Sequence, residues 1–369
     1  MSDNNLVIEI EAILAEAKPR ITEDCYIYRV PYDIHQVNVD AYTPMFISIG
    51  PFHHFDQQLQ NMEKLKHVYF KQFGAQSNTK LEDLIHTVKE EEPRLRCCYS
   101  ENLEMSTDKL VKVMLVDACF IVELFYQNCH NGWRNLMKPN LLFSISLDLL
   151  LLENQTEFSA NFTTCHFTDL LRTFHLQNPS PNREGLMGVK PIPTATAFSE
   201  AGGKFKTNES KCILDWQFEK GCLTIPSIAL DNTNEILFRN MVALEQCHYP
   251  DGGYITDYVW AMDFLINTVE YVDILNKNGI LIRWIGDDAE LAKMFNSLTT
   301  NVLKEDFNSQ YFGLFEEMNV FYYDRWHQMR ATLKRDYCNT PWRTLATCAA
   351  IAILFLTLTQ SIFSILQAV

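Results

Sequence analysis

The sequence predicts a mainly α-helical globular domain that carries one small β-hairpin and ends in a C-terminal transmembrane helix. Three observations predict this class. Apolar residues recur at helical spacing in both halves of the chain, and two alternating segments flank a single Lys-Gly turn. An uncharged run then extends from Thr344 to Leu366.

The amino-acid composition limits the classes of protein to which the chain can belong. The chain has 369 residues, of which 47% are hydrophobic and 21% charged, values that are typical of a folded protein. Its formal net charge is −15 and no dense block of Lys and Arg occurs, so we expect no nucleic-acid partner. The 11 cysteines include no CxxC pair, which favours a reducing compartment over a disulfide framework.

The first half is predicted to be helical after a lead-in at 1–23, which is acidic and lacks a secretory signal. We expect this helical half to span 24–176. Its first helix lies near 56–73, where the apolar residues are Leu59, Met62, Leu65, Tyr69 and Phe73. The segment 107–127 is apolar almost all round and predicts a central buried helix. Two further helices are expected at 141–155 and 168–176.

A connector of low order is predicted at 177–211, where Pro, Gly, Ser and Asn dominate. The second half, 212–338, opens with the hairpin: Leu214, Trp216 and Phe218 alternate before the Lys-Gly turn, and Leu223 and Ile225 alternate after it. Helices are then expected over 234–247, 256–279, 287–303 and 316–337.

The C-terminal segment 342–366 is predicted to be a tail anchor. A helix over Thr344–Leu366 is roughly 34 Å long, enough to cross a hydrocarbon core of about 30 Å. Pro341 suits the first helical turn, and Trp342 suits the interface. Basic residues on the N-terminal side of the span, Lys334, Arg335 and Arg343, predict a cytosolic soluble part on the endoplasmic reticulum or plasma membrane. The alternative is a buried C-terminal helix.

Two adjacent histidines, His53 and His54, follow a Gly-Pro turn and are the first candidate site residues. Glu63 and His67 could join them in a metal site, but adjacent histidines point about 100° apart on a helix, and no HExxH or paired CxxC pattern occurs. We therefore expect no metal, no cofactor and no catalytic residue. There is also no nucleophile elbow, and AGGK at 201–204 lacks the frame of a phosphate-binding loop.

Acidic residues on the predicted buried helix are the second candidates. Asp117 shares a face with Leu110 and Val113, so its carboxyl must be hydrogen-bonded or have a raised pKa. Glu123 lies about 120° round the helix from Asp117, which argues against an acid–base pair. We expect structural carboxylates that cap loops or pair with Arg29, Arg172 or Arg239.

Several segments together resemble one plant family, domain of unknown function 247. They are Ile27–Pro31, AYTPMFISIGPFHH at 41–54, Met62 with Glu63 and Lys66, Met114–Glu123, DLLLLENQ at 148–155, AGGKF at 201–205, FRNMVALEQC at 238–247 and GILIRWIGDD at 279–288. The chain departs from the family pattern at Ala118, where glycine is common, in TATAF (194–198), which replaces a usual SATEL, and at Gly203, where a β-branched residue is usual.

The resemblance implies a mainly helical, membrane-tethered plant protein without an established enzymatic activity. Some grass members are associated with self-incompatibility loci, which implies a recognition or signalling role. The resemblance assigns no catalytic residue. Its motif positions of unknown role are His53, His54, Glu63, Asp117, Glu123, Glu153, Asn154, Gln155, Glu245 and Gln246.

Three functional hypotheses remain open from the sequence. The first is a tail-anchored module that binds unidentified protein partners or assembles as a homo-oligomer. The second is an unrecognised, metal-dependent enzyme that uses His53, His54, Glu63 and His67. The third is a lumen-facing protein, which glycosylation at Asn161 or Asn208 would reveal.

Overall fold

The computed structural model describes residues 7, 25, 27–44, 47–131, 167–176, 192–230, 232–249, 252–266, 268–283, 287–303, 309–325, 328–329, 332 and 341–368. The predicted helix at 141–155 lies outside the described residues, together with Glu153, Asn154, Gln155 and Asn161. The chain divides into two compact units. One comprises Met1–Thr173 and Arg239–Pro250, and the other Phe174–Phe238 and Asp251–Val369.

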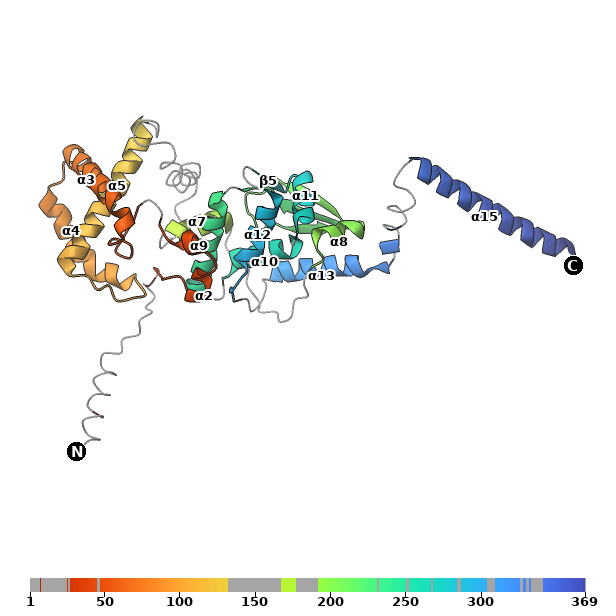
Figure 1. Cartoon of the computed structure of the whole chain (residues 1–369), viewed down its shortest axis with the longest axis horizontal. Helices are drawn as coiled ribbons and strands as arrows, with labels where there is room; N and C mark the ends of the chain where they lie inside the picture. The colour runs from red at the N-terminus through yellow and green to blue at the C-terminus, as the bar shows by residue number, and fades with distance from the viewer. Residues whose placement is uncertain are drawn as a thin grey trace. The chain divides into compact units, whose positions relative to one another are not determined.

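The first unit is helical, and its longest helix packs against two others. Helix α5 contacts both α3 and α4 (Figure 1). Its buried side chains include Leu110, Val113, Phe120 and Leu124, so the predicted central helix is confirmed. The elements of this unit are α2 (Tyr32–His35), η1 (Val39–Tyr42), η2 (Gln57–Leu59), α3 (Gln60–Gln76), α4 (Leu81–Cys97) and α5 (Thr107–Asn131). The unit boundary falls within α7 (Phe167–Leu176) and α9 (Asn232–His248).

The inward face of α3 carries charge. Tyr69 is buried as predicted, and Leu59 is buried just before the helix begins, but Glu63 and Lys66 are buried beside them. Met62, Leu65 and Phe73 are only half-buried. The helix is therefore turned so that two charged side chains face α5, an arrangement that requires internal partners for both.

The second unit combines two small sheets with helices. The predicted hairpin is confirmed: β2 and β3 are antiparallel, with Phe218 opposite Leu223. Both turn residues, Lys220 (φ 50°) and Gly221 (φ 75°), have positive φ, as a type I′ hairpin turn requires. The elements are α8 (Ala195–Glu200), β1 (Lys204–Asn208), β2 (Gln217–Glu219), β3 (Cys222–Pro226), β4 (Ile228–Leu230), α10 (Tyr254–Leu265), α11 (Val269–Lys277), β5 (Leu281–Arg283), α12 (Asp288–Leu298), α13 (Ser309–Tyr323) and α15 (Pro341–Ala368).

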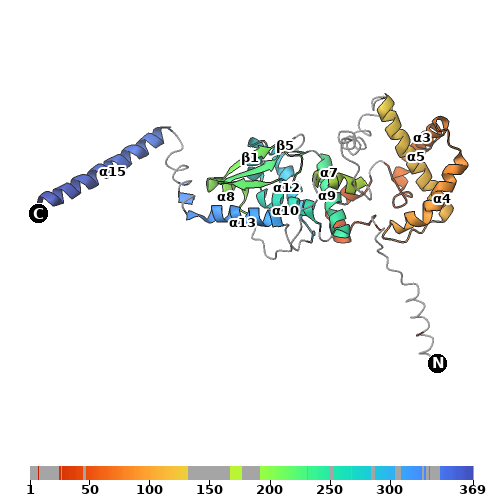
Figure 2. The ribbon, with the colours of Figure 1, turned by 180° about the vertical axis from the view of Figure 1, so that it is seen from behind.

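The sheets contain strands beyond the hairpin. Strand β1 lies parallel to β3, which gives the order β1-β3-β2, and β4 lies parallel to β5 in a second sheet. Residues 195–208, predicted as part of the connector, form α8 and β1, which pack on one another (Figure 2). The Thr194 hydroxyl caps α8 by accepting a hydrogen bond from the Ala197 amide.

The predicted helix over 256–279 is two helices. Helix α10 ends at Leu265, and α11 begins after Thr268, whose backbone is extended. Ile266 is fully buried at this break. Farther along, α15 begins at Pro341, the early-helix position predicted for this proline.

Candidate functional site

The Gly-Pro turn of the first unit is fastened to α5. Gly50 has φ 78°, a conformation that glycine adopts without strain, and its N–H donates to Asp117 Oδ2 at 2.8 Å. A Cβ at this position would lie 2.9 Å from the Tyr99 hydroxyl. Gly50 is therefore required both by the turn and by its close approach to Tyr99.

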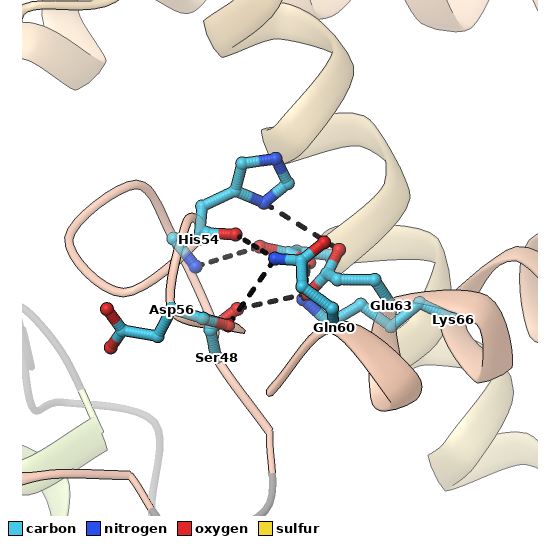
Figure 3. A network of polar contacts seen from close by, with 8 residues as sticks. Ser48, His54, Asp56, Gln60, Glu63 and Lys66 are labelled. Atoms are coloured by element: carbon cyan, nitrogen blue, oxygen red, sulfur yellow. Dashed lines mark hydrogen bonds and ion pairs between the residues drawn. The ribbon is translucent and has the colours of Figure 1, made fainter. Parts of the chain in front are cut away.

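The Asp117 carboxylate belongs to a buried cluster of one ammonium and two carboxylates. Figure 3 labels three members of this cluster, Ser48, Glu63 and Lys66. Lys66 is 0% exposed, and its Nζ lies 2.6 Å from Glu63 Oε1 and 2.5 Å from Asp117 Oδ1. The Ser48 hydroxyl donates to Glu63 Oε1 at 3.0 Å. We call Ser48, Gly50, Glu63, Lys66 and Asp117 the Lys66 cluster. It joins the turn, α3 and α5 through charge-assisted hydrogen bonds.

The two histidines have different neighbours. His53 Nδ1 lies 2.9 Å from Asp56 Oδ2, and Asp56 is the residue before η2. His54 Nδ1 lies 3.7 Å from Glu63 Oε2, beyond hydrogen-bond distance, while the His54 carbonyl accepts from Gln60 Nε2 at 2.8 Å (Figure 3). The histidines thus border the start of α3 without converging on one point.

The described residues contain no group of three or more His, Cys, Asp or Glu side chains that could hold a metal ion. His67, the fourth member of the metal hypothesis, is exposed on α3. Glu63 is occupied by Lys66 and Ser48, so a metal ion at its carboxylate would have to displace an ammonium.

The electrostatics of the Lys66 cluster indicate a structural role for its charged side chains. Burial raises the pKa of the Asp117 carboxyl above its ordinary value, and the opposing effects of Lys66 and the Gly50 amide do not cancel this. Burial also raises the pKa of Tyr99 to about 12, so its hydroxyl stays protonated. Fixed donors of the protein occupy both Asp117 oxygens, which favours a structural role for this carboxylate.

Asp117 therefore pairs with Lys66, and none of the predicted arginines is the partner. Arg29 forms an exposed ion pair with Glu101 at 2.9 Å, and Arg172 binds Glu245. Sequence reasoning quoted Lys66 only as a motif position. The available signal was its i, i+3 spacing from Glu63, which places the two side chains on one helix face.

Glu123 lies in different surroundings from Asp117, as its place on the helix predicts. Its side chain is 1% exposed, and Oε1 accepts from Gln76 Nε2 at 3.2 Å, from the end of α3. Burial raises the pKa of the nearby Tyr69, and the Glu123 charge adds to this effect. Glu123 thus holds the C-terminal end of α3.

A second polar network joins α7 to the end of α9 in the first unit. Arg172 Nε donates to Glu245 Oε1 at 2.8 Å, and its guanidinium lies 4.2 Å from the centre of the Tyr249 ring. The Tyr249 hydroxyl donates to Asp169 Oδ1 at 2.8 Å. Glu245 of the ALEQC motif is thus part of a buried ion pair, and the adjacent Gln246 is half-buried.

The same network extends to Tyr28 and Cys25. His248 Nδ1 lies 2.9 Å from the Tyr28 hydroxyl, which itself donates to the Cys25 carbonyl at 2.8 Å. Burial lowers the pKa of His248, so its ring is neutral at neutral pH. Sequence analysis identified none of Tyr28, Asp169 and His248 as site residues.

Comparison with known proteins identifies one matching family and relatives of similar length. A family described as plant protein of unknown function, DUF247, matches residues 27–159 and 156–356. The UPF0481 protein At3g47200 of Arabidopsis thaliana is 28% identical over 417 residues, which cover 94% of this chain and 87% of the relative. The putative UPF0481 protein At3g02645 of the same plant is 21% identical, covering 89% and 88%. No solved structure matches.

Proposed function

The chain belongs to the DUF247 family of plant proteins of unknown function, and we propose that it is a tail-anchored membrane protein that presents its helical domain to protein partners in the cytosol. The observation that carries the proposal is the exposure of α15. None of the apolar window Leu345–Phe363 is buried in the chain's own fold. Water is a poor solvent for such a helix, and a bilayer removes this cost.

The length and ends of α15 suit a single span. Pro341–Ala368 comprises 28 residues, about 42 Å of helix at 1.5 Å per residue, which exceeds a hydrocarbon core of about 30 Å. Trp342 at its start is 80% exposed, as suits an interfacial aromatic residue. Lys334, Arg335 and Arg343 on this side favour retention of the preceding chain in the cytosol.

The fastened turn supports the partner-binding part of the proposal. Phe55, directly after the two histidines, is 56% exposed, and Lys109 Nζ lies 4.1 Å from the centre of its ring. The Lys66 cluster holds the preceding turn against α5, so Phe55 is presented from a rigid support. Exposed aromatic residues on rigid supports are typical anchors of protein interfaces.

Membrane extraction tests the anchor. The full chain expressed in plant cells should remain in the membrane pellet after alkaline carbonate treatment. Leu354→Arg combined with Leu358→Arg places two charges in the span and should release the chain into the supernatant. Leu303→Arg, at a residue that is 81% exposed in the second unit, is the matched control and should stay in the pellet. Wild-type chain in the supernatant, or a double variant that stays in the pellet, would refute the anchor.

Site-specific photo-crosslinking tests the partner surface. A photoreactive phenylalanine analogue at position 55 should give discrete protein adducts in the membrane fraction. The same analogue at Leu81, which is 49% exposed on α4, is the control. Equal adduct patterns at the two positions, or none at position 55, would contradict a partner surface around Phe55.

A further inference from the structure

One face of α15 is made mainly of small and polar residues, with a single bulky residue, Ile353, at its centre. Ala346, Ala350, Ile353, Thr357 and Gln360 follow one another at intervals of four, three, four and three, and all of them are exposed. At about 100° per residue these positions fall within an arc of about 80°. We call this set the Gln360 stripe.

The opposite face of the same helix is bulky. Ile351, Phe355, Leu358 and Ile362 lie about 120° to 180° round the helix from Ala346. Large side chains pack well against lipid chains, whereas small residues allow two helix backbones to approach closely. The two faces therefore differ in what covers them: the bulky face suits lipid and the Gln360 stripe suits another helix.

Gln360 differs from three other polar residues of the span, because its side chain makes no hydrogen bond within the part of the helix whose side chains the structure describes. Thr357, Thr359 and Ser361 each donate to a carbonyl of α15, at 2.9, 2.8 and 2.8 Å. No hydrogen bond joins the Gln360 carboxamide to any other described residue. Within hydrocarbon an unpaired carboxamide is costly, so this side chain requires a partner in the membrane.

We propose that a second copy of this chain supplies that partner, and that two α15 helices pair along their Gln360 stripes. A carboxamide has both a donor and an acceptor, so two Gln360 side chains related by a twofold axis satisfy one another. The 3.5-residue spacing of the stripe matches a left-handed crossing of two helices. The inference rests on the proposed membrane anchor, because the same amide in water has no need of a partner.

Disulfide scanning of the full chain in membranes tests the pairing. In a Cys348→Ala background, single cysteines replace Ala350, Ile353 or Thr357 on the stripe and Ile351, Phe355 or Leu358 on the opposite face. Oxidation should give a dimer band above that of the background chain at the three stripe positions and little at the other three. Equal crosslinking on both faces, or stronger crosslinking on the bulky face, would overturn the proposal.

Removal of the amide tests its contribution. Gln360→Leu should lower crosslinking at position 353 about fivefold or more, in keeping with the strength of such bonds in membranes. Thr359→Val, a matched change on another face, should leave it unchanged. Unchanged crosslinking in Gln360→Leu would overturn the role of the amide. Wild-type chain that carbonate extracts would refute the anchor and the pairing together, whereas carbonate-resistant chain without stripe-specific crosslinks refutes the pairing alone.

Discussion

The ring of Phe198 occupies the space in which a side chain at position 203 would begin. A Cβ on Gly203 would lie 2.4 Å from both Cε1 and Cζ of Phe198, far inside van der Waals contact. Phe198 is fully buried and packs against the rings of Phe205, Phe218 and Phe321. The resemblance described above implies leucine at 198 and a β-branched residue at 203, so we expect the larger ring and the missing side chain to compensate one another.

This compensation predicts a strong coupling between the two positions. Gly203→Val should lower the free energy of unfolding of the second unit by about 1–3 kcal/mol, because the added atoms overpack the aromatic core. Combining it with Phe198→Leu should recover most of this loss. The measurement is a double-mutant cycle from urea unfolding.

The glycine at position 313 provides the control for that cycle. An added Cβ there meets nothing within 4 Å, so Gly313→Ala in α13 should stabilise by up to about 1 kcal/mol through helix propensity. Additive effects of Gly203→Val and Phe198→Leu would show that the two residues do not compete for space.

Lys66→Met should destabilise the first unit strongly. The substitution removes the ammonium and leaves the buried Glu63 and Asp117 carboxylates without it, a loss of about 3–5 kcal/mol for a broken buried pair. Hydrogen exchange of α3 and α5 amides in the full chain measures the effect. Lys64→Met, at an exposed position of the same helix, is the matched control and should change exchange little. Equal effects of the two substitutions would refute the structural role of Lys66.

Asp117→Ala should loosen the Gly-Pro turn specifically. The Gly50 N–H loses its acceptor, and its exchange with solvent should accelerate at least about tenfold, since local opening no longer breaks a charge-assisted bond. Asp108→Ala, on the same helix but paired with Lys89 at the surface, should leave Gly50 exchange unchanged. A Gly50 amide that remains protected in Asp117→Ala would mean that other contacts hold the turn.

Asp263 predicts a pH dependence in the second unit. Burial raises its pKa from 3.8 to about 6, although Thr299 donates to its carboxylate at 3.3 Å. Because the folded state holds this proton more tightly, the contribution to stability is largest below the unfolded pKa and is lost as the pH rises through about 6.

Asp263→Asn removes this ionisation. The variant should be more stable than wild type at pH 8, by about 1 kcal/mol after allowance for partial exposure, and should match it near pH 4. Urea unfolding across this range measures the difference. Asp273→Asn, at an exposed carboxylate of α11, is the control. A stabilisation independent of pH would rule out ionisation as its cause.

Much of the fold could be predicted because many of its helices and strands are determined by patterns within their own short segments of sequence. The all-round apolar pattern of 107–127 identified α5, and alternation about a Lys-Gly turn identified the β2–β3 hairpin. Strands β4 and β5 were missed because they have three residues each and pair in parallel across more than 50 residues of sequence. Such short strands carry no readable alternation, and their partners are set by the tertiary fold.

The site was predictable in its residues but not in their pairing. Motif resemblance singled out His53, His54, Glu63 and Asp117, and the structure places all four around the start of α3 and the facing part of α5. The periodic pattern placed apolar residues on the inward face of α3 and gave no reason to bury Lys66. A buried lysine is stable only with partners from other segments, and the identity of those partners is tertiary information.

The membrane topology of the full chain distinguishes a cytosolic helical domain from a lumenal one. A glycosylation acceptor sequence appended after Val369 of the full chain reports whether that end reaches the lumen. We predict a glycosylated C-terminal tag together with an unmodified Asn208, whose Nδ2 donates to the Asp215 carbonyl at 3.0 Å in the second unit. An unmodified tag, or carbohydrate on Asn208, would contradict a tail anchor that holds the helical domain in the cytosol.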